Sequence, residues 1–86
     1  MKYEVKWTDT ALRQLKKLGK PVCKQIIEKI EKIVENPFLF VKRLKELPFY
    51  SLRVGDYRVI MSIDGKNLVV FVLEVGHRRK IYKKFS

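Results

Sequence analysis

Hydrophobic and polar residues alternate along much of the chain. Residues 2–7 (KYEVKW), 50–54 and 57–63 carry apolar side chains at every second position. This period of two is typical of strands with one buried face. Residues 68–75 (LVVFVLEV) are almost continuously apolar, as in a strand that is covered on both faces. The pattern predicts one strand at the start of the chain and three in its second half.

Between these strands, apolar residues recur at steps of three and four, which indicates two helices. Thr8 is a suitable N-cap for the first helix, and Gly19 ends it. Pro21 suits the first turn of the second helix, which we expect to run to about Glu35 before the Asn36-Pro37 pair. The short connection predicts an antiparallel helical hairpin.

These elements predict an α+β fold in a single domain, residues 1–86. We expect an N-terminal strand, the helical hairpin and then a three-stranded meander, forming an antiparallel sheet with the helices on one face. Residues 38–48 are expected to be an irregular surface connection, and residues 78–86 form a basic tail.

Composition excludes several classes of protein. No apolar run reaches the roughly 18 residues that a membrane span needs, and residues 1–7 lack the apolar core of a signal peptide, so we expect a cytoplasmic protein without membrane contact. Cys23 is the single cysteine, and His77 is the single histidine. This leaves no disulfide framework and no ligand spacing for a metal. We expect neither a metal nor a cofactor.

The charge is the most informative part of the composition. Twenty Lys and Arg against nine Asp and Glu give a formal net charge of +11. Solubility alone requires a net charge of only about 2 to 8 in a domain of this size. The excess commonly marks a chain that meets phosphates, an acidic membrane surface or an acidic protein partner, and RNA is the partner that we favour.

The turn Gly55-Asp56 brings two arginines together. A two-residue hairpin loop places Arg53 opposite Arg58, on the same face as Ser51 and Ile60. Two facing arginines repel each other, and a bound phosphate would remove that cost. The other face is expected to pack under the helices. It carries Tyr50, Leu52, Val54, Tyr57, Val59, Met61 and Ile63.

A second basic cluster follows the last strand, in the sequence GHRRKIYKKF of residues 76–85. Arg78 precedes Tyr82 by four residues, so that a guanidinium fork and an aromatic ring lie in one short segment. Arginine suits phosphate oxygens, and an aromatic ring can stack on a nucleobase. A solvated basic tail is the alternative interpretation.

RNA cleavage is the chemistry that these residues best permit. The sequence has no Gly-rich phosphate loop and no serine or cysteine nucleophile paired with a base. RNA supplies its own nucleophile, the 2′-hydroxyl, so an enzyme needs only to align it, stabilise the charged phosphate and move protons. Arginines can stabilise the charge, and a tyrosine beside cations can handle protons.

Two strings, YSLRVGDYRVI at residues 50–60 and VGHRRKIY at residues 75–82, resemble the RelE branch of the RelE/ParE toxin superfamily. The resemblance extends over essentially the whole chain. That family consists of toxins paired with an antitoxin, and its RelE members cleave messenger RNA in the ribosomal A site without a metal. The resemblance therefore implies a RelE-like fold and an endoribonuclease that inhibits translation.

The same resemblance implies roles for individual residues. Arg58 and Arg78 would stabilise the scissile phosphate with help from Arg53, and Tyr82 would orient the nucleotide or transfer a proton. Ser51 departs from a RelE type that has a lysine there as proposed general base, so His77 or Tyr82 remain candidates for that role. Further basic or polar residues are predicted to bind RNA or the ribosome: Lys42, Arg43, Lys45, Ser51, Arg79, Lys80, Lys83 and Lys84.

Two other functions remain open from the sequence. A ParE-like toxin would bind DNA gyrase and cut nothing, and a plain nucleic-acid-binding module would track the phosphate backbone without catalysis. A toxin also implies a partner that silences it. We expect a RelB-like antitoxin, acidic and partly disordered when free, together with the ribosome and mRNA as targets.

Overall fold

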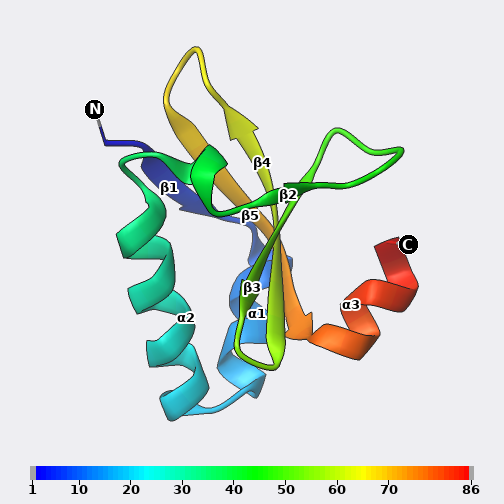
Figure 1. Cartoon of the computed structure of the whole chain (residues 1–86). Coiled ribbons are helices and arrows are strands. Elements are labelled where there is room, and N and C mark those ends of the chain that lie inside the picture. Colours follow the sequence, from blue (N-terminus) through cyan, green and yellow to red (C-terminus); the bar gives the residue numbers. More distant parts are fainter. Residues whose placement is uncertain (1, 86) are drawn as a thin grey trace.

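The computed structural model describes residues 2–85, so the two ends of the predicted 1–86 domain, Met1 and Ser86, lie outside the described residues. The elements follow in the order β1 (Glu4–Trp7), α1 (Asp9–Lys17), α2 (Lys20–Ile33), the 3-10 helix η1 (Pro37–Leu39), β2 (Lys42–Arg43), β3 (Tyr50–Val54), β4 (Tyr57–Asp64), β5 (Val69–His77) and α3 (Arg78–Phe85). The predicted α+β class is confirmed, as is the order of strand, two helices and meander (Figure 1).

The strands form one sheet in the order β1-β5-β4-β3-β2. β3, β4 and β5 pair antiparallel as predicted, but β1 lies parallel to β5, with Val5 opposite Val70. The sheet is therefore mixed rather than antiparallel throughout, which corrects our expectation. Alternation reports which side chains are buried and not the direction of the neighbouring strand. The long connection from β1 to β5 allows the chain to return in the same direction.

α1 and α2 cover one face of the sheet and form the main core with it. Ala11 and Leu15 of α1 and Ile26, Ile30 and Ile33 of α2 are buried there. The sheet contributes Leu52, Val54, Val59, Met61, Val70, Val72 and Val75, with Tyr50, Tyr57 and Ile63 partly buried against them. The inward face predicted for residues 50–63 is thus confirmed. No helix within residues 2–85 is long and apolar enough to cross a membrane.

α3 lies on the opposite side of the sheet from α2 (Figure 1). The prediction that the two hairpin helices share one face is confirmed, but residues 78–85, expected as a basic tail, form a third helix that was not predicted. Ile81 is the one buried side chain within Arg78–Phe85, and it contacts Gly76. Gly76 has no side chain, and this allows the short helix to lie close to the strand. The five cations of this segment led us to expect a basic tail, and the helical spacing of Ile81, Tyr82 and Phe85 was overlooked.

The segment between α2 and β3 is more ordered than expected. It contains η1 and the two-residue strand β2, in which Lys42 pairs with Ser51 and Arg43 pairs with Tyr50. β5 differs from its prediction in another way. It lies between β1 and β4, but Phe71 on its second face is 37% exposed. α3 covers only the end of that face, so β5 is not buried on both sides.

Candidate nucleic-acid interface

The β3–β4 hairpin has the register that the sequence predicted. Arg53 lies opposite Arg58, and Val54 lies opposite Tyr57. Gly55 has a φ of 59°, a left-handed value that glycine adopts without strain and that this tight turn requires. The two arginine side chains then diverge. The exposed Arg53 donates from Nε to the Gly55 carbonyl oxygen at 3.2 Å, whereas Arg58 donates from Nη1 to the Ser51 hydroxyl at 3.1 Å.

Arg58 keeps one unsatisfied hydrogen-bond donor. Its Nε is buried and has no hydrogen-bond partner among the described residues. Ser51, which holds the other end of the guanidinium, is itself only 4% exposed. An unpaired buried donor costs roughly 1–3 kcal/mol, more when the group is charged. This arrangement is unfavourable in the free protein, and the incompletely paired guanidinium favours an anion in the pockets that Arg58 lines.

α3 brings a second set of groups to the same face of the sheet. The Arg78 backbone N–H donates to the Asp56 carbonyl oxygen at 2.8 Å, which ties the start of α3 to the hairpin turn. Gly76 lies opposite Arg58 in the β4–β5 ladder. A Cβ atom at Gly76 would lie 3.1 Å from Cγ1 and Cδ1 of Ile81. The absence of that atom lets Ile81 pack on the sheet while Tyr82 remains 62% exposed.

Two pockets adjoin at Arg58 and Tyr82, which line both of them. The larger has a volume of about 600 Å³ and lies between residues 42–47, the β3–β4 strands and α3. The smaller has a volume of about 410 Å³ and is lined by Arg58, Arg78, Arg79, Tyr82 and Lys83. The smaller pocket is thus formed by four cations and one phenol, a composition suited to a phosphate beside a base.

Most of the residues predicted from the sequence line one of these pockets. The larger pocket includes Lys42, Arg43, Lys45, Ser51, Arg58, Tyr82 and Lys84, and the smaller adds Arg78, Arg79 and Lys83. Three predicted residues line neither pocket: Arg53, His77 and Lys80. The sequence therefore identified the cationic lining well, while the structure divides it between two pockets.

His77 lies away from the two pockets. It pairs with Tyr57 in the β4–β5 ladder, on the face opposite to Arg58. The two rings pack edge to face, with centroids 5.7 Å apart, and Nδ1 accepts from the Arg79 N–H at 3.4 Å. Tyr82, the other candidate general base, lines both pockets.

Sequence reasoning placed Ile60 on this face but missed the rest of the apolar lining of the larger pocket. Leu44, Leu47, Ile81 and Phe85 also contribute to it. A signal for part of this set was present. Ile81, Tyr82 and Phe85 are spaced as neighbours on one face of a helix, which would have predicted a helix that presents its apolar side to the sheet. Residues 44 and 47 carried no such signal.

Electrostatics concentrate positive charge at these pockets. Arg78–Phe85 contains five Lys or Arg residues and no acidic residue. The structure has two ion pairs within residues 2–85: an exposed one between Lys24 and Glu28 on α2, and one between Lys84 and Glu74. No three His, Cys, Asp or Glu side chains in the described part of the chain converge to hold a metal ion.

A mixed five-stranded sheet with a helical hairpin on one face, and a cationic helix beside an arginine hairpin on the other, defines the class of RelE/ParE toxins. Comparison with known proteins agrees. Residues 5–82 match the family described as ParE toxin of type II toxin-antitoxin system, parDE, and the chain belongs to this family. Its RelE-like character follows from the relatives.

The relatives cover almost the entire chain. The mRNA interferase toxin RelE of Escherichia coli K12 is 30% identical over 93% of this chain and 87% of its own length. Toxin RelG of Mycobacterium tuberculosis is 34% identical over 98% of this chain and 100% of its own length. In the crystal structure of the RelBE2 toxin-antitoxin complex from M. tuberculosis, the matching chain has a TM-score of 0.84 and 31% identity, over 91% of this chain and 100% of that one.

Proposed function

We propose that this toxin, as a single domain over residues 1–86, is a ribosome-dependent endoribonuclease that cleaves mRNA in the A site and so inhibits translation. The observation that carries the proposal is the incompletely paired guanidinium of Arg58, which lines both pockets together with Tyr82. A phosphate in these pockets would be attracted to this cation and become better bound as its negative charge increases in the transition state. Groups of this kind accelerate reactions because they are oriented before the charge develops.

The reaction that we propose needs no nucleophile from the protein. The RNA 2′-oxygen attacks the adjacent phosphorus, the bond to the 5′-oxygen breaks, and the products are a 2′,3′-cyclic phosphate and a 5′-hydroxyl. Arg58 and Arg78 would stabilise the phosphate oxygens, with Arg53 adding charge from the neighbouring strand. One proton must leave the 2′-hydroxyl and another must reach the 5′-oxygen. Tyr82 is better placed than His77 for such a transfer, because it lines both pockets.

The ribosome and an antitoxin are the proposed partners. A net charge of +11 favours docking on a surface of ribosomal RNA as well as binding of the message. Lys42, Arg43, Lys45 and the α3 cations would make phosphate contacts around the reacting group. The M. tuberculosis relative was crystallised as a RelBE2 toxin-antitoxin complex. We infer a RelB-like antitoxin, acidic and partly disordered when free, that covers this cationic surface.

The gyrase-binding alternative is not favoured. The family model carries the ParE description, but a relative that covers nearly the whole chain at 30% identity is named an mRNA interferase. The plain RNA-binding alternative predicts that affinity is lost evenly over the lysines, with no special role for Arg58, Arg78 or Tyr82.

The test is cleavage of an mRNA positioned in the A site of purified ribosomes. We expect cuts at defined positions with the wild type, and a loss of roughly 10²-fold or more in rate for Arg78→Ala and for Tyr82→Phe. Arg13→Ala, which removes the same charge from an exposed position on α1, should cut like the wild type. If the wild type leaves the message intact at a salt concentration where it still binds ribosomes, the proposal is overturned. A supercoiling assay with gyrase would then be the next test.

A further inference from the structure

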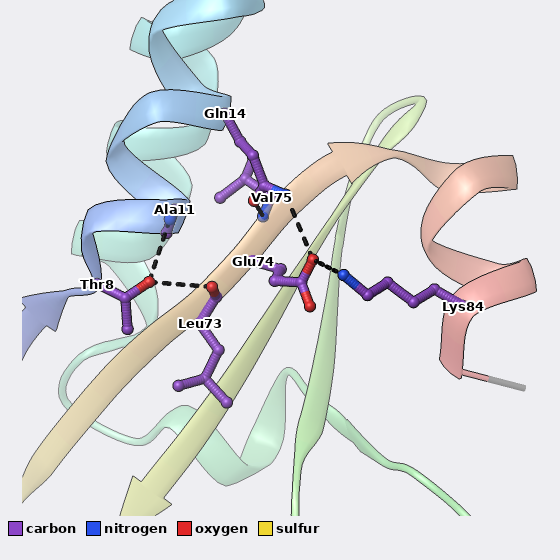
Figure 2. Close-up of polar contacts among 7 residues, drawn as sticks. All are labelled: Thr8, Ala11, Gln14, Leu73, Glu74, Val75 and Lys84. Carbon is purple, nitrogen blue, oxygen red and sulfur yellow. Dashed lines mark hydrogen bonds and ion pairs between the residues drawn. The ribbon is translucent and has the colours of Figure 1, made fainter.

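Glu74 occupies an unusual position for an acidic residue in so cationic a protein. It lies on β5 opposite Ile60, and its side chain is only 14% exposed. Its Oε1 accepts from Lys84 Nζ at 2.7 Å and from Gln14 Nε2 at 3.3 Å. Figure 2 shows the carboxylate between these two side chains, one from α1 and the other from α3. A single oxygen atom therefore links three elements.

The α1 side of this link is firmly held. β1 ends at Trp7, so the edge of β5 beyond Val72 has no strand beside it. Side chains of α1 and its cap satisfy that edge instead: Gln14 Oε1 accepts from the Val75 N–H at 2.7 Å, and Thr8 Oγ1 donates to the Leu73 carbonyl at 3.0 Å (Figure 2). Because Gln14 uses its oxygen for Val75, its NH₂ group is directed to Glu74.

The α3 side has few attachments. Within Arg78–Phe85, Ile81 is the only buried side chain, and the Arg78 N–H is bonded to the Asp56 carbonyl at the start of the helix. Toward its end, the described contacts are those of Lys84 with Glu74 and with the ring of Phe85. The five cations of α3 also repel one another. Glu74 is the one carboxylate within residues 2–85 that forms an ion pair with this helix.

We propose that Glu74 is a positioning residue for the nuclease site. Its carboxylate holds the second half of α3 on the sheet through Lys84 and braces that contact against α1 through Gln14. It thereby sets the position of Tyr82, which lies two residues before Lys84 and lines both pockets. This inference rests on the proposed function for its effect on cleavage, but its effect on α3 can be measured independently.

The variant Glu74→Gln distinguishes a role of Glu74 in positioning α3 from a role in the electrostatic attraction of RNA. Glu74→Gln removes a negative charge, so the protein becomes more cationic and its attraction for RNA and ribosomes increases. A weaker electrostatic attraction therefore cannot explain a slower reaction in this variant. We expect the single-turnover rate constant to fall roughly threefold to tenfold, because the amide oxygen can still accept from the Lys84 ammonium but the ion pair is lost. The concentration for half-maximal rate should stay unchanged or decrease.

Glu74→Ala removes the acceptor altogether and should slow the reaction more than Glu74→Gln does. Addition of Lys84→Met to Glu74→Ala should cost no more than Lys84→Met alone, because both changes break the same contact. Glu28→Gln is the matched control, since it makes the same charge change and breaks the exposed pair with Lys24 on α2. Wild-type rates in Glu74→Gln and Glu74→Ala alike would overturn the proposal.

Hydrogen exchange of the α3 backbone amides tests whether Glu74 holds α3 on the sheet. This test works even if the wild type does not cut RNA. The amides of residues 82–85 are those that intrahelical bonds protect. We expect them to exchange roughly fivefold faster in Glu74→Ala, with the core amides of α2 and β4 unchanged. Equal exchange at these residues in wild type and Glu74→Ala would refute the positioning role. Absence of cleavage by the wild type would refute the proposed function instead.

Discussion

The guanidinium of Arg58 has one donor satisfied by Ser51 and another that is buried and unpaired. Arg53, across the hairpin, is exposed and uses its Nε on the Gly55 carbonyl. The two arginines look equivalent in the sequence, but they differ in how well the fold satisfies their hydrogen-bond donors. Arg53 is accommodated by the fold, whereas Arg58 is left in a state that a phosphate would improve.

We expect Arg58→Met to reduce cleavage strongly while leaving the stability of the protein almost unchanged. The substitution removes the unpaired donor and the repulsion with Arg53, but it also removes the bond to the Ser51 hydroxyl, so these effects offset and the free energy of unfolding should change by no more than about 1 kcal/mol. Cleavage should fall roughly 10²-fold or more, because a donor to the developing charge is lost. Urea denaturation and the A-site assay measure the two effects. A fall in stability above about 1 kcal/mol would mean that Arg58 is needed for the fold itself.

Asp64 makes a separate prediction about acid stability. Its pKa is held below the usual 3.8, first by the Asn67 side chain and then by the N–H groups of Asn67 and Lys66. A lowered pKa in the folded protein means that the stabilisation is complete above the unfolded value and is lost as pH falls through the folded one. Asp64→Ala should therefore destabilise the protein at pH about 7 and make little difference at pH about 2.

Denaturant titrations of the wild type and of Asp64→Ala at both pH values test this. Asp64 is the last residue of β4, at the opposite end of that strand from Arg58, and it lines neither pocket, so cleavage by Asp64→Ala should match the wild type. A stability difference that is equally large in acid would show that the charge on Asp64 is not its cause.

Among the elements, α3 buries little against the sheet but supplies many of the residues that line the two pockets. It contributes four of the residues lining the larger pocket and four of those lining the smaller one, yet it buries only Ile81. α1 and α2, by contrast, bury two and three residues respectively and line neither pocket. An element with few buried contacts opens more easily than the rest of the protein.

Ile81→Ala should therefore affect α3 more than the whole domain. We expect faster exchange of the α3 amides and slower cleavage, with only a small change in the thermal midpoint. Ile26→Ala, in the core under α2, should cost roughly 2–5 kcal/mol and lower the thermal midpoint strongly. Calorimetry and hydrogen exchange on the two variants test the contrast. Equal loss of thermal stability would mean that α3 and the main core unfold as one unit.

At the scale of the molecule, the net charge of +11 is distributed unevenly. The pockets gather Lys42, Arg43, Lys45, Arg58 and the cations of α3, while the Lys24–Glu28 pair on α2 is locally neutral. Counterions released from RNA make its binding depend on salt in proportion to the number of phosphates contacted. The salt dependence thus reports which lysines and arginines touch RNA.

Binding of single-stranded RNA should weaken with a logarithmic salt slope of about −3.5, which corresponds to about five phosphates. Lys83→Gln, in the smaller pocket, should reduce the magnitude of the slope by roughly 0.7, whereas Lys24→Gln should leave it unchanged. Fluorescence anisotropy across a salt series measures this. Equal slopes for both variants would indicate that RNA binds without preference for the pocket face.

Much of the site could be read from the sequence because short-range geometry determines it. A two-residue turn sets the register of a hairpin, so Arg53 had to face Arg58, and alternation had to place Val59 and Met61 on the core side. The strings at residues 50–60 and 75–82 carried the family resemblance. The α+β class, the order of the elements and most of the cationic lining followed from such local patterns.

Long-range contacts decided the rest. The parallel pairing of β1 with β5 depends on how the chain returns, and the docking of α3 depends on the space left by Gly76. The unpaired Nε of Arg58 and the position of Glu74 between Gln14 and Lys84 involve side chains distant in sequence. The sequence by itself determined which residues share a strand face. Only the tertiary structure decided which faces meet, because burial and hydrogen bonding depend on neighbours that no local pattern specifies.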